Sequence, residues 1–309
     1  MYTQYQKIKS ITLKQIVYAL AAADAGSVTA AAHNLHVSQP SISTAIAALE
    51  QHYGLKLFTR HPAHGVSLTR FGVKVMAEAR LLCDQAQTVA ALAGPNAGLS
   101  GEIGLCCYEA IAPYILPRLL MRLREKLPDV IVRYTEADME GVANTLKRGA
   151  ADLAITYDLG LESDMLTQTI YSLQPHVICP VDHEFADRKS VFLSELHNQK
   201  LVLLDQPLSA QYVLGLLRAS KVDPIITAQV RGFELLRSLV ANGFGIAVTH
   251  THPKTAVTYD GRPICSIPIA DDLAEQRILL AYMPQTQIRP VLKAAQAEIV
   301  ASFVNYVTV

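Results

Sequence analysis

Hydrophobic residues recur with the period of an α-helix in three consecutive segments near the start of the chain. Apolar side chains stand at positions i, i+3, i+4 and i+7 of the segments that begin at Leu13, Val28 and Ile42. This spacing places them on one face of a helix. It therefore predicts three short amphipathic helices that share one small core.

The residues between these segments are of the types that begin and end helices. Thr12, Ser27 and Ser38 each precede a segment and can cap its first turn, and Gly26 can end the first helix. Two short helices separated by a tight turn form the unit with which many proteins read DNA. An ordinary three-helix bundle without a DNA role is the alternative.

A hairpin pattern follows the third predicted helix. Residues 56–60 and 66–69 have the composition of strands, and the sequence HPAHG at 61–65 predicts the turn between them. Such a hairpin would form a wing beside the third helix. Cationic residues on it would be placed to meet DNA phosphates.

A longer helix is expected at residues 71–93. Its apolar residues recur about every 3.5 positions between Val75 and Ala93, which is the narrow seam of a helix that pairs with another helix. Packing against the body of the same chain is the alternative. The Gly- and Pro-containing segment 94–101 then predicts a hinge.

Strand and helix patterns alternate in two runs after the hinge, which is typical of parallel α/β sheets. The expected strands are 103–107, 130–134, 152–156, 201–204, 225–230 and 246–249, and the expected helices are 113–127, 139–148, 210–219 and 233–242. Two similar runs predict two lobes, with residues 166–180 between them. The late strands 264–268 and 277–282 are expected to return to the first lobe, and 291–304 to form a closing helix.

The predicted fold class is therefore α/β, with an N-terminal all-α winged helix-turn-helix. We expect a DNA-binding domain at 1–70, a linker helix at 71–93 that pairs with another helix, a hinge at 94–101 and a two-lobed α/β domain at 102–309. Lobe I would comprise about 102–170 and 265–309, and lobe II about 171–264.

Charge is distributed unevenly along the chain. Residues 1–75 carry seven Lys and Arg residues against two acidic residues, a net charge of +5, whereas the 309-residue chain as a whole is neutral. A basic terminal domain on an acidic body indicates a polyanionic partner for the first part only. Half of the residues are hydrophobic, so the composition is that of a folded protein rather than a disordered one.

Cysteine usage and hydropathy indicate a cytoplasmic protein. The five cysteines are odd in number and match no zinc spacing, and no apolar run is long enough to span a membrane. Residues 16–23 loosely resemble a secretory signal, but they continue the helical pattern that follows. No cofactor or metal is expected.

Four motifs stand in order in the first part of the chain: AAAHNLHVSQPSIS at 30–43, IAALE at 46–50, GLKLFTR at 54–60 and LTRFG at 68–72. They resemble the motifs of the LysR-type transcriptional regulators. Weaker matches follow at 116–117, 127–128, 146–149, 151–155 and 240–248, so the resemblance covers nearly the whole chain. It implies that the third helix enters the major groove, that the linker helix at 71–93 makes a dimer, and that residues 102–309 form a periplasmic-binding-protein-like, effector-binding domain.

The face of the third helix opposite its apolar stripe offers amide, hydroxyl and proline groups, which can read base edges. The expected base-reading residues are Ser38, Gln39, Pro40, Ser41, Ser43 and Thr44. No Lys or Arg lies on this face, so phosphate contacts are expected from Lys56, Arg60 and Arg70. The family commonly has Pro-Ala where Arg70 and Phe71 stand, and often arginine in the wing where this chain has histidine.

The effector pocket is expected beyond the carboxyl ends of the strands, where open α/β sheets bind ligands. The residues expected there are Cys107, Tyr108, Glu109, Glu136, Tyr157, Asp158, Asp205, Ser209, Phe233, Glu234 and Thr249. Ser209 and the amides after Gly232 could hold a carboxylate, and an acid or Tyr157 could hold an amine. An amino acid or related nitrogen compound is the expected effector, with helix caps and surface groups as the alternative role of the acids.

Three other functions are weighed against a regulator. An enzyme would show a nucleophile elbow, a P-loop or a dinucleotide fingerprint, and none is present. A transport-type solute-binding protein fits the second part but not the first, and a thiol switch would depend on the adjacent Cys106 and Cys107. The expected partners are promoter DNA with an imperfect palindrome, a small-molecule effector and further copies of the chain in a homodimer or homotetramer, with RNA polymerase as another candidate.

Overall fold

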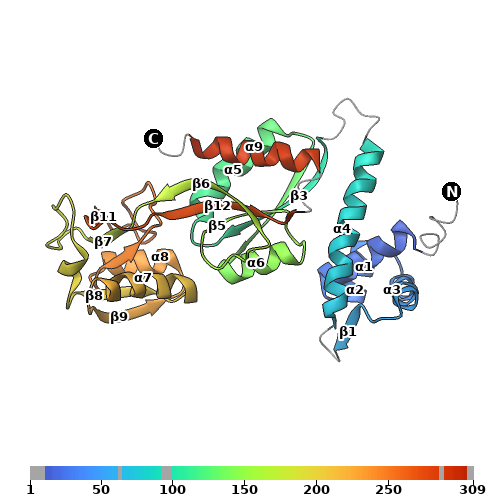
Figure 1. Ribbon diagram of the computed structural model, residues 1–309, viewed down its shortest axis with the longest axis horizontal. Helices are drawn as coiled ribbons and strands as arrows, with labels where there is room; N and C mark the ends of the chain where they lie inside the picture. The colour runs from blue at the N-terminus through green and yellow to red at the C-terminus, as the bar shows by residue number, and fades with distance from the viewer. Residues whose placement is uncertain (1–10, 62–64, 92–98, 285–288, 305–309) are drawn as a thin grey trace.

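The computed structural model describes residues 11–61, 65–91, 99–284 and 289–304. Figure 1 shows a helical N-terminal domain, one long helix (α4) beside it, and an elongated body whose far end carries β7, β8, β9 and β11. The mixed α/β class and the helical N-terminal region predicted from the sequence are confirmed. Residues 94–98 of the predicted hinge and residues 92–93 at the end of the predicted linker helix lie outside the described residues.

Three helices form the core of the N-terminal domain: α1 (Leu13–Ala25), α2 (Val28–Asn34) and α3 (Gln39–Tyr53). Thr12, Ser27 and Ser38 cap them through side-chain oxygens, as predicted, and Gly26 ends α1 in the left-handed conformation at φ 59°. The buried residues of the three helices form one cluster with Leu57, Phe58 and Met76. The predicted helix-turn-helix is thus confirmed.

The wing consists of β1 (Phe58–His61) and β2 (Gly65–Leu68), which pair antiparallel. Helix α4 (Arg70–Ala91) follows directly. Thr69 joins the two, because its hydroxyl donates to the carbonyl of Lys56 at 2.7 Å and accepts from the amide of Gly72 at 2.9 Å.

A five-stranded sheet forms lobe I. Its order is β4-β3-β5-β12-β6, where β3, β4 and β5 are parallel and β12 is antiparallel to both of its neighbours. The strands are β3 (Gly101–Tyr108), β4 (Val130–Ala137), β5 (Leu153–Tyr157), β6 (Leu166–Leu173) and β12 (Gln276–Tyr282). The helices of this lobe are α5 (Ala112–Lys126), α6 (Met139–Lys147) and α9 (Pro290–Val304).

Lobe II combines parallel and antiparallel strands in a similar way. Parallel β8 and β9 are joined through a bridge between Leu201 and Ile246 to the antiparallel strands β10, β7 and β11. The strands are β7 (His176–Pro180), β8 (Lys200–Leu204), β9 (Ile225–Val230), β10 (Ala247–Thr249) and β11 (Ile264–Pro268). The helices are the short 3-10 helix η2 (Leu193–Leu196), α7 (Pro207–Ala219) and α8 (Phe233–Ala241).

One strand was assigned to the wrong lobe from the sequence. Residues 264–268 were expected to return to lobe I, but β11 pairs with β7 in lobe II, from Ile264 opposite Pro180 to Pro268 opposite His176. Ile264 and Ile267 are buried there. The chain therefore returns to lobe I only after Pro268, and the expected lobe boundary at 265 is incorrect by the length of that strand.

Within the parts of the chain that the structure describes, no helix combines the length and the apolar character needed to cross a bilayer.

Candidate functional site

The first turn of α3 presents a set of polar side chains to solvent. Ser38 Oγ accepts from the Ser41 amide at 3.4 Å and lies 2.7 Å from Ser41 Oγ, so these two hydroxyls complete the helix cap. Gln39 Nε2 donates to Ser43 Oγ at 3.2 Å. Pro40 is exposed at the start of the same helix, and Thr44 follows one turn later. The expected base-reading residues are thus brought together at one helix end.

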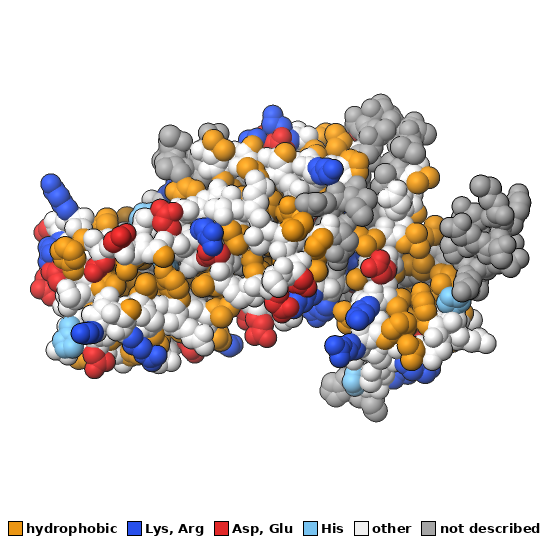
Figure 2. Space-filling view, viewed as in Figure 1, with side chains coloured by type: hydrophobic (Ala, Val, Ile, Leu, Met, Phe, Trp, Pro, Cys, Tyr) orange, Lys and Arg blue, Asp and Glu red, His pale blue; other side chains and the backbone are white. Residues whose placement is uncertain are grey.

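The three expected phosphate ligands are all exposed, but they differ in their surroundings. Lys56 is paired with Glu50 at 2.6 Å while 78% of its side chain remains exposed. Arg60 lies on β1 of the wing, and Arg70 begins α4. Figure 2 shows Lys and Arg side chains gathered at the end of the molecule that carries the wing. The sequence had suggested no role for Glu50.

Glu50 fixes the chain as it enters the wing. Its Oε1 accepts from the amides of Leu57 at 3.0 Å and Phe58 at 3.3 Å. Burial by itself raises the pKa of this carboxyl, but the hydrogen bonds from Lys56 and the two amides outweigh burial and leave the pKa below its ordinary value. Glu50 is therefore ionised near neutral pH and holds the wing against α3.

A cleft opens at the carboxyl ends of the strands of both lobes. Five of the expected effector residues line it, namely Tyr108, Tyr157, Ser209, Phe233 and Thr249. Its cavity volume is about 40 Å³. Tyr108 and Tyr157 come from lobe I, and the other three come from lobe II. The rule that ligands bind beyond parallel strand ends thus places almost half of the expected set at one cleft.

Hydroxyl groups dominate the contacts across this cleft. Tyr108 Oη donates to Gln206 Oε1 and lies 3.3 Å from Ser209 Oγ, and Tyr157 Oη lies 2.7 Å from Thr251 Oγ1. The centroids of the two tyrosine rings are 5.4 Å apart. Burial raises the pKa of Tyr108 to about 12, so its hydroxyl keeps its proton and remains a donor.

The other six expected effector residues do not line the cleft. Glu136 and Asp205 are exposed, and Cys107 is buried in β3. Glu109 accepts from Gln206 Nε2 at 2.7 Å, and Asp158 accepts from Arg277 Nε at 2.7 Å. Glu234 binds Tyr114 and Arg237. The carboxylates at the strand ends are thus engaged by neighbouring side chains or by solvent.

Sequence reasoning missed further residues of the cleft. The polar ones are Tyr212, Thr251 and Gln276, and the apolar ones include Met139 and Leu159. His250 follows β10 directly, so the strand-end rule indicates it, and it also lines the cleft. Tyr212 lies more than one turn into α7 and Gln276 at the start of β12, where that rule gives no signal.

Two buried histidines lie in or beside the cleft. His250 lines the cleft, and its Nε2 has no hydrogen-bond partner; the same is true of Nε2 of His176, at the start of β7. Burial lowers the pKa of His250 to about 4 and that of His176 to about 3. Among the described residues, no group of three or more His, Cys, Asp or Glu side chains could hold a metal ion.

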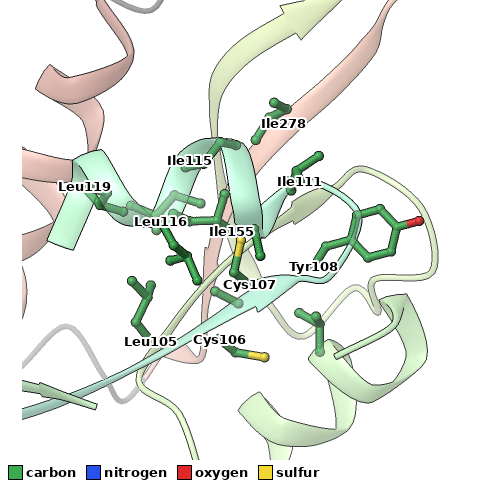
Figure 3. Packing of buried hydrophobic residues seen from close by; sticks show 14 of the residues in the cluster. Leu105, Cys106, Cys107, Tyr108, Ile111, Ile115, Leu116, Leu119, Ile155 and Ile278 are labelled. Carbon is green, nitrogen blue, oxygen red and sulfur yellow. The ribbon is translucent and has the colours of Figure 1, made fainter. Parts of the chain in front are cut away.

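The adjacent thiols of β3 are separated by the geometry of the strand. Figure 3 shows the sulfur atoms of Cys106 and Cys107 on opposite sides of β3. Both residues are free and buried, and burial raises both pKa values. A thiol that stays protonated is a poor nucleophile, so this pair does not favour the thiol-switch alternative.

We predict that the effector domain loses stability as the pH falls from about 6.5 towards 4. The unfolded chain binds protons on His176 and His250 below about pH 6.5, whereas the folded chain does so only near pH 3 and pH 4. Each histidine then costs about 2 kcal/mol of unfolding free energy at about pH 5. Urea unfolding followed by circular dichroism at about pH 7 and about pH 5 measures this loss.

The variant His250→Gln should remove about half of this pH dependence, because glutamine does not titrate. His36→Asn is the control, since His36 is exposed in the N-terminal domain and asparagine tolerates its positive φ of 52°. An unchanged loss of stability in His250→Gln would contradict the assignment.

Comparison with known proteins identifies both parts of the chain. The family description "Bacterial regulatory helix-turn-helix protein, lysR family" matches residues 13–73, and "LysR substrate binding domain" matches residues 96–303. The chain is 29% identical over 288 residues to the HTH-type transcriptional regulator TfdS of Cupriavidus pinatubonensis, covering 91% of this chain and 95% of the relative. It is 30% identical over 247 residues to the HTH-type transcriptional regulator CysB of Haemophilus influenzae, covering 75% and 73%.

Solved structures agree with this assignment. HinK, a LysR family transcriptional regulator from Pseudomonas aeruginosa, is 28% identical with a TM-score of 0.63, over 95% of this chain and 98% of that chain. A variant of full-length OxyR from Pseudomonas aeruginosa shares the fold with a TM-score of 0.75 at 24% identity, over 95% and 97%. Because the two LysR family descriptions match in order and together cover most of the chain, the chain belongs to the LysR-type transcriptional regulators.

Proposed function

We propose that this regulator binds promoter DNA as a dimer or tetramer in the cytoplasm and that a small molecule bound between its lobes controls DNA binding or bending. The single observation that carries the proposal is the hydroxyl-lined cleft at the facing strand ends, on the same chain as an exposed first turn of α3. Residues 1–70 read DNA, 71–93 pair the subunits, 94–101 form the hinge and 102–309 bind the effector. The chain is a regulator and not an enzyme.

The division between base reading and phosphate binding follows from the placement of charge. The start of α3 carries amide and hydroxyl groups, which discriminate base edges, while Arg60 on the wing and Arg70 at the start of α4 can bind phosphates. Lys56 must exchange part of its contact with Glu50 for a phosphate. Because Lys56 would have to weaken its ion pair with Glu50 to bind a phosphate, Arg60 is a stronger candidate for a phosphate contact than Lys56.

Exposed apolar residues support assembly with further copies. Leu82 and Val89 on α4 are 49% and 60% exposed, as expected of a helix seam whose partner helix is a second subunit. The edge strands of the lobes add Ile131 on β4 and Ile225 on β9, both more than half exposed. Edge strands with apolar faces are commonly covered in an assembly.

Replacing Gln39 by Ala should relax the base preference at one position, with a loss of about 1–3 kcal/mol of discrimination. Arg60→Ala should instead weaken binding to all duplexes and lower the slope of log K against log salt by about 0.9. Fluorescence anisotropy with a duplex selected from a randomised pool measures both. Arg133→Ala, an arginine of β4 in lobe I, is the control, and an unchanged base preference in Gln39→Ala would exclude Gln39 from readout.

The lining of the cleft favours an effector of low net charge. Among the described residues that line it, none is Lys, Arg, Asp or Glu, whereas Tyr108, Ser209 and Thr249 offer hydroxyl groups. An amino acid or related nitrogen compound fits this lining, because its opposite charges balance and each can be held by several hydroxyl and amide groups. The carboxylate–amine scheme with Glu109, Asp158 or Asp205 has no support, since none of these acids lines the cleft.

A thermal-shift screen of the common amino acids and of small amines against the full chain should find at least one compound that raises Tm, because a ligand that binds only the native state stabilises it. Ser209→Ala should weaken that compound about fivefold through the loss of one neutral hydrogen bond. Ser190→Ala, which makes the same change in lobe II outside the cleft lining, is the control. A screen without any such compound would exclude this effector class and leave the regulator assignment intact.

One structural route connects the cleft to the DNA-binding helices. Helix α6 begins at Met139, which lines the cleft, and is capped at its end by Arg148, whose carbonyl accepts from Arg80 of α4 at 2.9 Å. The same guanidinium forms an ion pair with Asp24 of α1. A shift of α6 on effector binding would therefore act directly on both α4 and α1.

Arg80→Met should uncouple effector binding from DNA binding. We expect the effector Kd to stay within about twofold of the parent value, because Arg80 lies outside the cleft, while the effector-induced change in DNA affinity falls by about tenfold. Arg122→Met, which removes the α5–α9 ion pair with Glu298, is the matched control. Full retention of the effector response in Arg80→Met would exclude this route.

A further inference from the structure

Two cysteines lie directly opposite each other on neighbouring strands of lobe II. Cys179 of β7 pairs with Cys265 of β11 in the antiparallel register. Both thiols are free. The proposed DNA and effector contacts use neither of them, and they are distinct from the adjacent cysteines of β3 in lobe I.

The side chains of this pair lie on the same face of the sheet. Cys179 belongs to the buried cluster of lobe II that includes Ile267, and Cys265 packs against the same cluster. The neighbouring residues Ile178 and Ile264 belong to a different cluster, because side chains alternate between the two faces of a strand. The two thiols are therefore on one side of the sheet, with no backbone between them.

The backbone hydrogen bonds of β11 indicate the spacing of the pair. The Ile264 amide donates to the Ala256 carbonyl, so Ile264 directs its backbone groups away from β7. Cys265, the next residue, directs its backbone groups towards β7 and forms a hydrogen-bonded pair with Cys179. The Cα atoms of such a pair are about 5.5 Å apart. Disulfides need a Cα distance of about 4.4–6.8 Å, so a bridge can form without separating the strands.

The two thiols differ in their access to solvent. Cys179 is fully buried on the central strand β7, whereas Cys265 is partly exposed on β11, at the edge of the three-stranded sheet. A small oxidant can therefore reach Cys265 first. The cysteines of β3 are both buried and lie on opposite sides of their strand (Figure 3), so they lack both properties.

We propose that Cys179 and Cys265 form a modification site at which a hydroperoxide produces a reversible disulfide between β7 and β11. The Cys265 thiolate attacks one peroxide oxygen and becomes a sulfenic acid, and the O–O bond breaks. The other oxygen takes up the thiol proton and leaves as water or an alcohol. The Cys179 sulfur then attacks the sulfenic sulfur, an S–S bond forms, and the sulfenic hydroxyl leaves with the Cys179 proton as water. The two thiols lose two electrons, and the peroxide gains them.

The second step is assisted by its intramolecular geometry. Burial and the charge of Cys265 raise the pKa of Cys179 to about 12, so a fraction of about 10⁻⁵ of this thiol is ionised at about pH 7. The contribution of the Cys265 charge disappears when that residue becomes a neutral sulfenic acid. Well-oriented intramolecular reactions reach effective molarities of about 10⁵–10⁸ M, which offsets the small fraction of thiolate.

The disulfide would join the two strands that connect the lobes. It lies three residues after the start of β7 at His176 and three residues before the end of β11 at Pro268. The loop that it closes contains about 85 residues and includes most of lobe II. Closing a loop of this length restricts the unfolded chain, so oxidation stabilises lobe II.

Thiol titration and peptide mapping of the full chain test the site. The reduced protein is treated with hydrogen peroxide and unfolded without reductant, after which the free thiols are titrated and disulfide-linked peptides are mapped by mass spectrometry. We expect the loss of two of the five thiols, one peptide pair linked through Cys179 and Cys265, and recovery of both thiols with dithiothreitol. Five remaining thiols, or a loss of thiols without this link, would overturn the proposal.

Variants assign the two steps. Cys179→Ala should leave Cys265 as a sulfenic acid that dimedone labels, whereas Cys265→Ser should abolish both the link and the label. Cys83→Ser, which removes a partly exposed cysteine of α4, is the control and should leave the link intact. Dimedone labelling of Cys265 in the parent chain without the link would show that Cys179 does not complete the reaction, and would also overturn the proposal.

Thermal unfolding tests whether the bridge fits the native strands. Oxidation of the parent chain should raise Tm by about 5 °C or more, and Cys265→Ser should show no such rise. An unchanged or lower Tm in the linked protein would mean that the bridge distorts lobe II, which contradicts the assignment. These experiments use neither DNA nor effector, so their failure leaves the proposed regulatory function untouched.

Discussion

The relation between the two lobes depends on a pair of adjacent chain crossings. Leu173 pairs with Gln276 at the edge of the lobe I sheet, and His176 pairs with Pro268 in lobe II, so the chain leaves and re-enters lobe I side by side. Gln174 Nε2 donates to Glu275 Oε1 at 2.9 Å between the two crossings. Because the two connections lie side by side, they act as a hinge about which one lobe can rotate relative to the other. Strand ends of both sheets must then face each other, and the cleft follows from this constraint.

The same constraint separates what the sequence could predict from what it could not. The caps of α1, α2 and α3 and the apolar period of each helix are local, so the helix-turn-helix was predicted almost to the residue. The strand-end rule found Tyr108 and Thr249 because these residues end buried strands. Which lobe β11 belongs to is decided by its pairing with β7, a strand that is distant in the sequence. Local sequence patterns do not encode such a pairing. The prediction that Asp158 and Glu109 line the cleft was wrong for a related reason. Their partners, Arg277 and Gln206, come from segments that are distant in the sequence.

The chemistry of the two cavities differs although they share a wall. The Tyr108 hydroxyl already donates to Gln206 and the Tyr157 hydroxyl pairs with Thr251 in the cleft, so a ligand acceptor there competes with existing hydrogen bonds. A second cavity in lobe II is lined by Arg237, His252 and Lys254, so it presents guanidinium, imidazole and ammonium groups in addition to hydroxyls. Helix α8 supplies Phe233 to both cavities and Arg237 to the second.

The size of any effector response is limited by the contacts that it can change. A ligand shifts a two-state equilibrium only by its differential affinity for the two states. Between α6 and the N-terminal domain, the Arg80 guanidinium makes one hydrogen bond to the Arg148 carbonyl and one ion pair with Asp24. Hydrogen bonds to charged groups contribute about 1.5–3 kcal/mol. Breaking or remaking this contact can therefore change DNA affinity by about 10- to 150-fold per subunit. That range matches typical allosteric coupling, so no larger rearrangement of the lobes is needed.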